Sequence, residues 1–325
     1  MQQRRLGKTG YQVSEIGLGC WQMGGDFGAM DAATAASILD RAVELGVSFW
    51  DTADVYGGGE SERRIGAYLP QTSGQLVATK LGRGGALYPD NYTLAETRKS
   101  LEGSAERLGV ETLDLAQLHC VPIEVLRDGS AFKAMDALQQ DGLVRHWGAS
   151  VETIEQALIC LEHPGLATLQ IIFNIYRQDA VTQLLDRAAA ADVGIIVRLP
   201  LASGLLSGKF GKGHSFAASD HRHYNRDGAA FSVGETFGGI PFEKGVELTA
   251  QLQEMVPEGW PMSHLALRWI LDHPAVSTII AGVSRPDQLS DNVAASERPP
   301  LSDDLMAQLA AFYTDQVRPE VRGSI

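Results

Sequence analysis

Short apolar runs alternate along this chain with longer segments in which apolar residues recur at helical spacing. The runs predict eight strands, at residues 16–21, 47–51, 76–81, 113–119, 144–150, 169–174, 195–200 and 277–284. The run from Leu169 to Phe173 is apolar at all but one position, which is typical of a strand covered on both faces. The pattern therefore predicts a parallel sheet that is covered by helices.

The segments between these strands predict helices at 32–45, 93–108, 131–140, 154–161 and 180–191. In the first of them Ala36, Leu39 and Val43 fall on one stripe, as on an amphipathic helix. Glycines follow several of these segments directly, as expected where a left-handed residue ends a helix: Gly46, Gly109, Gly142 and Gly194.

Eight strands that alternate with helices are the number found in a (β/α)8 TIM barrel, an α/β fold. A doubly wound sheet would instead show a G-x-G-x-x-G turn after its first strand. Residues 17–22 read Gly-Leu-Gly-Cys-Trp-Gln, without the third glycine. We therefore expect residues 1–325 to form a single barrel domain.

Two segments lie outside the alternation. Residues 1–14 predict an N-terminal β-hairpin, with two short strands around a turn that contains Gly7 and Gly10. Residues 211–239 are rich in Gly, His and Ser and have no period, so they predict a long loop after strand seven. Such a loop would lie on the C-terminal face of the barrel, where barrels carry their active sites.

Composition restricts the possible functions. The chain has 27 Lys+Arg against 40 Asp+Glu, a net charge of −13, and no basic stripe, which argues against a nucleic-acid partner. No apolar run approaches a membrane span, and the start lacks a signal-peptide core. We expect a cytoplasmic protein that does not bind a membrane.

Cysteine and histidine spacing does not indicate a metal site. The chain has 3 cysteines without C-x-x-C spacing, and they are expected to be small buried residues. His221 and His223 lack a nearby third ligand at helical spacing, so we expect them to be solvated loop residues.

Polar side chains stand where three neighbouring strands are predicted to end. Asp51 ends the second strand, Lys80 the third and His119 the fourth, and Tyr56 follows one loop after Asp51. Taken singly, these residues also suit a buried Asp51–Lys80 ion pair beside a histidine without a role. Because adjacent strands deliver them to one patch, we interpret the set as catalytic.

The chemistry follows from the residue types. An ammonium group beside Tyr56 favours the phenolate and so should lower the tyrosine pKa toward neutrality. Asp51 would hold Lys80 in place, and a neutral His119 would orient the oxygen that receives the proton of Tyr56. Such a site protonates an oxygen on which negative charge develops, as when an external donor reduces a carbonyl with hydride.

These residues resemble the aldo-keto reductases over nearly the whole chain. Residues 5–10 (RLGKTG) and 13–19 (VSEIGLG) are similar to the N-terminal signature of that family, and residues 51–57 (DTADVYG) to its Asp–Tyr segment. Lys80 and His119 then complete the family's catalytic tetrad. The resemblance implies a barrel that binds NADPH in an extended form across its C-terminal face.

The resemblance also implies which residues contact the cofactor. Ser150 and Gln170 would hold the nicotinamide carboxamide, and the segment 200–209 would bind the pyrophosphate through Pro200, Leu201, Ser203, Gly204 and Lys209. The adenosine end would meet Gly282, Ser284, Arg285, Gln288 and Asn292. Ser284 and Arg285, at a helix start, would contact the 2′-phosphate, which favours NADPH over NADH.

The chain departs from the family pattern at two positions. Val151 follows Ser150 where many members have asparagine. Arg198 stands where an aromatic residue often stacks on the nicotinamide. A guanidinium can stack there, but its charge is unfavourable beside the oxidised, cationic ring, so we expect reduction to be favoured over oxidation.

The sequence thus predicts an NADPH-dependent oxidoreductase that reduces a small aldehyde or ketone to an alcohol. The alternative is a cofactor-binding regulatory subunit similar to the potassium-channel β subunits, which share these motifs. A metal-dependent hydrolase is disfavoured, because no trio of His, Asp or Glu ligands stands at the strand ends. Substrate choice should depend on Trp21 and Met23, the loop after Gly82, and residues 221–237.

Overall fold

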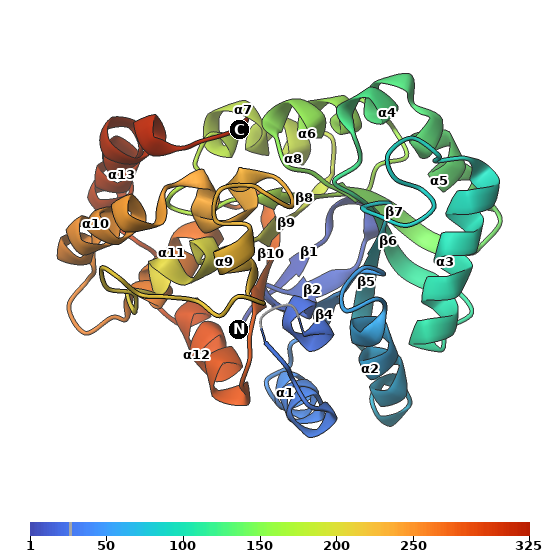
Figure 1. Ribbon diagram of the computed structural model, residues 1–325, viewed down its shortest axis with the longest axis horizontal. Helices are drawn as coiled ribbons and strands as arrows, with labels where there is room; N and C mark the ends of the chain where they lie inside the picture. The colour runs from blue at the N-terminus through green and yellow to red at the C-terminus, as the bar shows by residue number, and fades with distance from the viewer. Residues whose placement is uncertain (26–27) are drawn as a thin grey trace.

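The computed structural model describes residues 1–25 and 28–325, and within these ranges eight parallel strands close into a barrel (Figure 1). Their order around the barrel follows the chain, and the last strand pairs with the first. The strands are β3 (Ile16–Gly19), β4 (Phe49–Asp51), β5 (Leu76–Leu81), β6 (Leu113–His119), β7 (Val144–Ser150), β8 (Thr168–Ile172), β9 (Gly194–Arg198) and β10 (Val276–Gly282). The predicted TIM barrel is confirmed.

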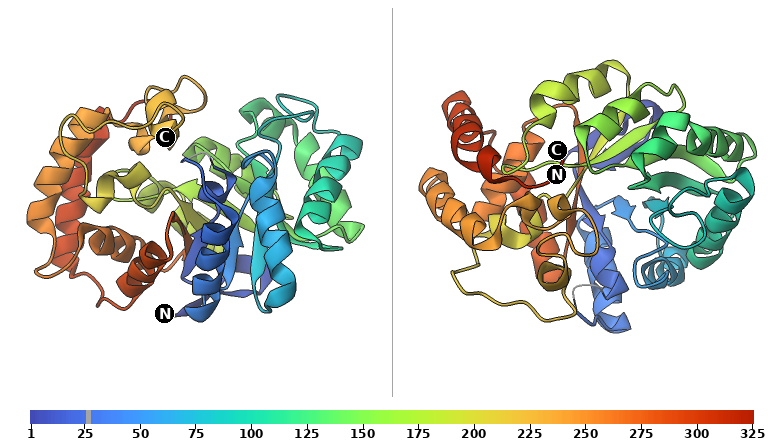
Figure 2. Two further views of the ribbon diagram at one scale, coloured as in Figure 1. Left: turned by 60° about the horizontal axis from the view of Figure 1, so that its bottom comes forward. Right: turned by 45° about the horizontal axis from the view of Figure 1, so that its top comes forward.

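Helices surround the strands on the outside (Figures 1 and 2). They are α1 (Ala32–Glu44), α2 (Glu60–Tyr68), α3 (Leu94–Leu108), α4 (Ile123–Asp128), α5 (Ser130–Gln140), α6 (Ile154–Leu161), α7 (Ala180–Gln183), α8 (Leu185–Ala190), α9 (His221–Tyr224), α10 (Phe242–Leu252), α11 (Met262–Leu271), α12 (Pro286–Ser296) and α13 (Asp303–Phe312). Trp50, Trp147 and Trp269 are fully buried in the apolar layer between barrel and helices.

One predicted helix differs from the structure. The segment 180–191 forms two short helices, α7 and α8, because Leu184 between them has the non-helical angles φ −129° and ψ −45°. The apolar pattern continues through this break, so the spacing alone does not reveal it.

The predicted hairpin forms and closes the N-terminal end of the barrel. Strand β1 (Gln3–Arg5) pairs antiparallel with β2 (Gln12–Ser14). Leu6 and Val13 are fully buried in a cluster with residues from inside the barrel, among them Phe49 and Leu115. Arg4 donates hydrogen bonds to the carbonyls of Leu271 and Val276, which tie the hairpin to the barrel wall.

The long loop after β9 contains short helical turns. Besides α9, it includes η5 (Val233–Glu235) and η6 (Phe237–Gly239), and Figure 2 shows it as the yellow-to-gold segment. Its residues Tyr224, Phe231 and Glu235 line a cavity at the C-terminal ends of the strands. The loop therefore forms part of the site that it was predicted to accompany.

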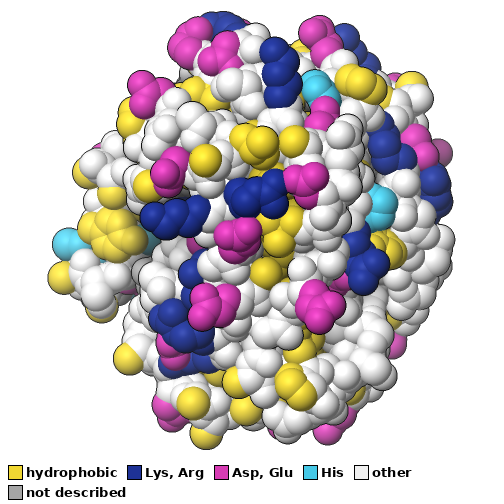
Figure 3. Space-filling model, turned by 90° about the vertical axis from the view of Figure 1, so that its right-hand side faces the viewer, with side chains coloured by type: hydrophobic (Ala, Val, Ile, Leu, Met, Phe, Trp, Pro, Cys, Tyr) yellow, Lys and Arg dark blue, Asp and Glu magenta, His cyan; other side chains and the backbone are white. Residues whose placement is uncertain are grey.

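The three cysteines are buried, as expected from their spacing. On the face shown in Figure 3, Lys and Arg side chains lie among Asp and Glu side chains. None of the helices in the described ranges has both the length and the apolar character of a membrane span. Cys20, Cys120 and Cys160 are buried, and burial raises the pKa of the Cys120 and Cys160 thiols to about 12.

Candidate active site

The predicted catalytic residues meet at the C-terminal ends of β4, β5 and β6. The ammonium group of Lys80 donates hydrogen bonds to Asp51, to the Thr52 carbonyl at 2.9 Å and to the Tyr56 hydroxyl at 3.0 Å. Tyr56 reaches this position from the turn after β4. The ring of His119 lies edge-on to the ring of Tyr56, with centroids 5.9 Å apart.

The carboxylate of Asp51 is held by more than Lys80. It accepts hydrogen bonds from Gln117 at 3.1 Å and from Gln170 at 2.8 Å. Gln170 in turn accepts a hydrogen bond from the hydroxyl of Ser150 at 3.3 Å. Ser150 and Gln170, predicted as carboxamide contacts, thus also connect β7 and β8 to the catalytic carboxylate.

Lys80 stays charged although it is fully buried. Burial disfavours the ammonium form, but Asp51 and Tyr56 outweigh this effect and raise the pKa of Lys80 above its usual range. An ammonium group has three donors, and here each has an acceptor. The buried Lys80–Asp51 ion pair therefore leaves no ammonium donor without an acceptor, as a stable buried pair requires.

The Tyr56 hydroxyl behaves differently from the expectation that Lys80 brings its pKa toward neutrality. Burial is the largest effect and raises the pKa of Tyr56 above its ordinary value, while Lys80 acts in the opposite direction. The residue types reveal the ammonium group beside Tyr56, but they do not reveal how far the phenol is removed from water. At neutral pH the hydroxyl is protonated, as a proton donor must be.

His119 is neutral at physiological pH, as expected. Burial lowers the pKa of this imidazole well below its usual value, and Arg83, Lys80 and Arg198 lower it further. Its Nδ1 is buried and has no hydrogen-bond partner among the described residues. Because His119 lines the cavity, its neutral ring can offer an N–H to a ligand oxygen there.

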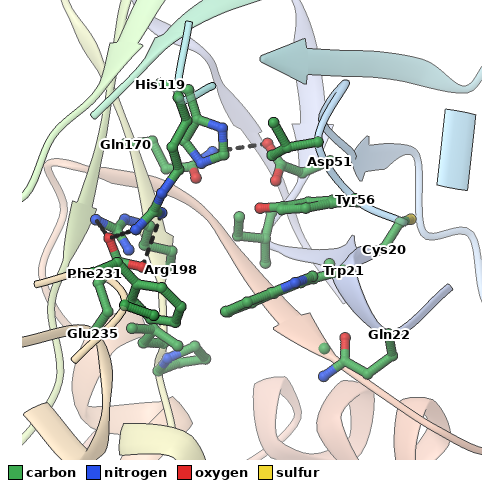
Figure 4. A pocket seen from close by; sticks show the side chains of 18 of the residues that line it. Cys20, Trp21, Gln22, Asp51, Tyr56, His119, Gln170, Arg198, Phe231 and Glu235 are labelled. Atoms are coloured by element: carbon green, nitrogen blue, oxygen red, sulfur yellow. Dashed lines mark hydrogen bonds and ion pairs between the residues drawn. The ribbon is translucent and has the colours of Figure 1, made fainter. Parts of the chain in front are cut away.

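A cavity of about 350 Å³ opens above these residues. Trp21 stacks on Tyr56, with ring centroids 5.7 Å apart and an interplanar angle of 16°. Figure 4 shows Trp21 and Tyr56 on one side of the cavity, with Arg198, Phe231 and Glu235 across from them. The predicted substrate contact Trp21 thus lies beside the predicted proton donor Tyr56.

A second cavity of about 390 Å³ adjoins the first. Gln22, Leu199, Pro200 and Gly282 line both, so the cavities form one groove across the C-terminal face. Most of the predicted cofactor contacts line the second cavity: Pro200, Leu201, Ser203, Gly204, Lys209, Gly282, Ser284, Gln288 and Asn292. The predicted pyrophosphate and adenosine contacts thus line one continuous groove with the predicted catalytic residues.

The predicted pyrophosphate segment forms a tight turn, η4 (Ala202–Ser207). Ser203 and Gly204 have left-handed φ angles of 55° and 99° inside this turn. A Cβ atom at Gly204 would lie 2.9 Å from the ring of Phe210. Both the backbone angle and the close approach therefore favour glycine here.

The far end of the groove lies at the start of α12. The backbone N–H of Ser284 donates to Gln288 Oε1 at 2.7 Å, and both residues line the cavity with Asn292. Arg285, predicted to meet the 2′-phosphate, has a side chain that is 61% exposed and pairs with Asp287 at 3.1 Å. In this structure its guanidinium thus binds a surface carboxylate next to the groove.

Arg198 lines the first cavity, but it has a partner that the sequence did not reveal. Its guanidinium lies 3.4 Å from Glu235, which arrives from the long loop, and donates to the Val151 carbonyl at 3.0 Å. Arg83, from the loop after β5, lies 2.8 Å from the same carboxylate. Nothing in the aperiodic segment 211–239 marks Glu235 as different from its neighbours.

The trio Cys120, Glu152 and Glu235 brings three possible metal-ligand atoms within 4.8 Å of one another. Sequence spacing does not reveal this trio. Because Glu235 already binds Arg83 and Arg198, these guanidinium groups would repel a cation from it. The cluster is thus better described as an ion-pair network.

The prediction for His221 was wrong. Its side chain is fully buried and its ring lies 5.0 Å from the ring of Trp21, whereas His223 is exposed as expected. Burial lowers the pKa of His221 to about 4. The turn of α9 directs this histidine inward, which the loop sequence does not indicate.

The sequence profile of the Aldo/keto reductase family matches residues 15–314. The chain belongs to this family. Its members are oxidoreductases that act on small carbonyl compounds with nicotinamide cofactors.

Similar proteins cover nearly the whole chain. An L-glyceraldehyde 3-phosphate reductase of Escherichia coli O157:H7 is 29% identical, over 97% of this chain and 93% of its own. A probable voltage-gated potassium channel subunit beta of Oryza sativa subsp. japonica is 27% identical, over 93% of each chain. The solved glycerol dehydrogenase of Gluconobacter oxydans has a TM-score of 0.80 at 27% identity, covering 100% of this chain and 98% of its own.

Proposed function

We propose that this aldo-keto reductase reduces an aldehyde or ketone to an alcohol with NADPH. The observation that carries the proposal is the hydrogen-bonded series from Asp51 through Lys80 to Tyr56, which ends in the cavity beside a neutral His119. Such an arrangement delivers a proton to one point on a ligand.

When bound, the nicotinamide cofactor supplies a hydride to the carbonyl carbon of the substrate. The Tyr56 hydroxyl donates its proton to the carbonyl oxygen, so that one O–H bond breaks and another forms. The nascent alkoxide is more basic than a phenol, so a raised tyrosine pKa does not prevent this transfer. Lys80, 3.0 Å away, stabilises the phenolate that remains, and His119 orients the oxygen.

The groove supports the binding of the cofactor in an extended form. The turn at Ser203 and Gly204 lines this cavity without bulky side chains, and Lys209 adds a positive charge to the same cavity. Ser284 and Arg285 at the start of α12 favour a 2′-phosphate and hence NADPH over NADH.

The test is Tyr56→Phe, measured in steady state with NADPH and a panel of carbonyl compounds. We expect kcat to fall by about 100-fold or more, because the proton donor is lost, while the NADPH Kd stays within about twofold. Tyr68→Phe is the matched control, since Tyr68 lies on α2 and its hydroxyl binds Asp40 outside the barrel. Near-normal turnover by Tyr56→Phe would remove Tyr56 from this role.

The second candidate is a cofactor-binding regulatory subunit. It is favoured by the rice relative and by a probable potassium channel subunit beta of Arabidopsis thaliana that is 28% identical. A rate of about 1 s⁻¹ or more on any carbonyl compound would support the enzyme. Tight NADPH binding with turnover far below that rate on the whole panel would support the subunit.

A further inference from the structure

Four charged residues form a cluster on the wall of the reaction cavity that faces Tyr56. We call Arg83, Glu152, Arg198 and Glu235 the arginine–glutamate cluster. They come from four separate segments: the loops after β5 and β7, the end of β9 and the long loop. Arg83, Arg198 and Glu235 line the same cavity as the catalytic residues, and Figure 4 shows Arg198 and Glu235 across it from Tyr56.

Glu235 is the centre of this cluster. Its side chain is 1% exposed, and it accepts hydrogen bonds from Arg83 at 2.9 Å and from Arg198 at 3.4 Å. Burial alone would raise the pKa of Glu235, but Arg198 and Arg83 hold it at about 2. The carboxylate is therefore charged throughout the physiological range.

Arg198 is the member of the cluster that is least well satisfied. It is 9% exposed, and its Nε is buried without a hydrogen-bond partner among the described residues. Its compensating negative charge comes from Glu235, which also serves Arg83. A charge in such a buried site acts strongly on any ligand in the cavity, because little water screens it.

We infer that Glu235 neutralises Arg198 at the cavity wall and thereby sets the relative affinity of the protein for oxidised and reduced nicotinamide cofactor. The inference rests on the proposed function, since it places the nicotinamide in the cavity with Tyr56. Loss of a hydride leaves the nicotinamide ring with a positive charge, whereas the reduced ring is neutral. Arg198 without its counter-ion would repel the oxidised form and leave the reduced form nearly unaffected.

Glu235 weakens the bias toward reduction that is expected from Arg198 alone. A lone guanidinium beside the ring would disfavour the oxidised cofactor and bias the enzyme toward reduction. With Glu235 in place the bias is reduced, so the protein can bind both forms during turnover. Glu235 is in this sense a positioning and charge-balancing residue, because it acts through Arg198.

The experiment measures the Kd of NADP+ and of NADPH by calorimetry at pH 6, without substrate. All variants carry Glu152→Gln, because Glu152 lies next to Glu235 and could ionise in its place. We expect Glu235→Gln to weaken NADP+ binding by about tenfold relative to NADPH. Adding Arg198→Met should return the ratio toward that of the Glu152→Gln parent, because Arg83 alone then gives the cluster the net charge that Arg83, Arg198 and Glu235 give it together.

Two further variants keep the test decisive. Arg198→Met alone, with Glu235 still bound to Arg83, should shift the ratio the other way, toward NADP+, and it covers the case in which Glu235→Gln does not fold. Glu247→Gln is the matched control, since Glu247 pairs with Lys212 on the surface and should leave the ratio unchanged.

The outcomes separate the inference from the proposed function. A ratio that stays within about twofold of the parent in both Glu235→Gln and Arg198→Met would overturn the inference. Failure of the parent to bind either cofactor would instead overturn the proposed function, on which the inference rests.

Discussion

Lys80 carries its charge at a position that is closed to water. Charged side chains in such places are tolerated only when they are paired and hydrogen-bonded, and Lys80 meets this condition through Asp51, Thr52 and Tyr56. In the proposed mechanism the same contacts hold the ammonium group against the phenol that donates the proton. Stability and proton donation thus depend on one side chain.

Replacing Lys80 should therefore damage both properties. Lys80→Met leaves the carboxylate of Asp51 buried without its cation, which should lower the free energy of unfolding by about 3–5 kcal/mol. Adding Asp51→Leu removes the unpaired carboxylate and should recover part of the lost free energy of unfolding. The double variant should remain inactive. Urea unfolding of the two variants checks this, and an unchanged midpoint for Lys80→Met would contradict it.

Glu152 is the residue whose ionisation should depend on the cofactor. Burial and the neighbouring Glu235 raise the pKa of Glu152 to about 7, while Arg198 and Arg83 act in the opposite direction. Cys120, the remaining neighbour, has a pKa of about 12 and stays protonated. A cationic ring in the cavity would stabilise the Glu152 carboxylate and lower its pKa.

NADP+ binding near pH 7 should therefore release up to about half a proton more than NADPH binding. Both forms carry the same phosphates, so the difference isolates the charge of the ring. Calorimetry in buffers of different ionisation enthalpy measures it, and Glu152→Gln should abolish it. Equal proton release by the two forms in the unmodified protein would contradict this expectation.

The sequence is sufficient to predict which residues stand at the ends of the strands, but not which residues of the loops point into the barrel mouth. Asp51, Lys80 and His119 each follow an apolar run, so the period of the pattern is enough to place them on one face of the barrel. Glu235 and His221 lie in a segment without a period. Their inward orientation results from tertiary contacts, here with Arg83 and Trp21 respectively.

The same limit applies to helices. The break at Leu184 falls inside an apolar pattern that continues from α7 into α8, and only the backbone angles reveal it. The residues that meet at the strand ends could thus be named from the sequence, whereas the counter-ions in the long loop could not. Local periodicity predicts an element, but a contact between distant loops requires the folded chain.

The start of α12 should determine the choice between the two nicotinamide cofactors. Arg285 pairs with Asp287 on the surface, and exposed pairs of this kind contribute little, so the guanidinium can turn to a phosphate at small cost. Arg285→Ala should raise the Kd of NADPH about fivefold or more and leave that of NADH unchanged.

Fluorescence titration with both cofactors measures this difference. Arg127→Ala is the matched control, because Arg127 is also an exposed arginine in ion pairs, with Glu124 and Glu155 on the outside of the barrel. An equal loss of affinity for NADPH and NADH in Arg285→Ala would show that Arg285 does not read the 2′-phosphate.

For the molecule as a whole, the two ends of the barrel have separate tasks. The hairpin seals the N-terminal end with Leu6 and Val13, and the groove lies at the C-terminal end. The net charge of −13 does not argue against an anionic ligand in the groove, because Lys209 lines it and places a positive charge there. Net charge thus argues against a polyanion partner but not against a dinucleotide.

This separation predicts that damage at one end leaves the other intact. Leu6→Ala should lower the free energy of unfolding by about 2–5 kcal/mol, because it opens a cavity in a fully buried cluster. Cofactor affinity below the unfolding transition should not change. Leu94→Ala, at a leucine that is 44% exposed, should cost far less, and equal losses in the two variants would contradict this account.

The long loop carries part of one wall of the reaction cavity, including the carboxylate of Glu235. Tyr224 and Phe231 shape the space that a substrate enters, and Glu235 lies a few residues further along the same segment. During evolution, a change in substrate preference made through this loop would therefore also affect the preference for cofactor redox state. An engineer who grafts a new loop onto this barrel should therefore retain Glu235, so that a change of substrate does not also change the relative affinity for the oxidised and reduced cofactor.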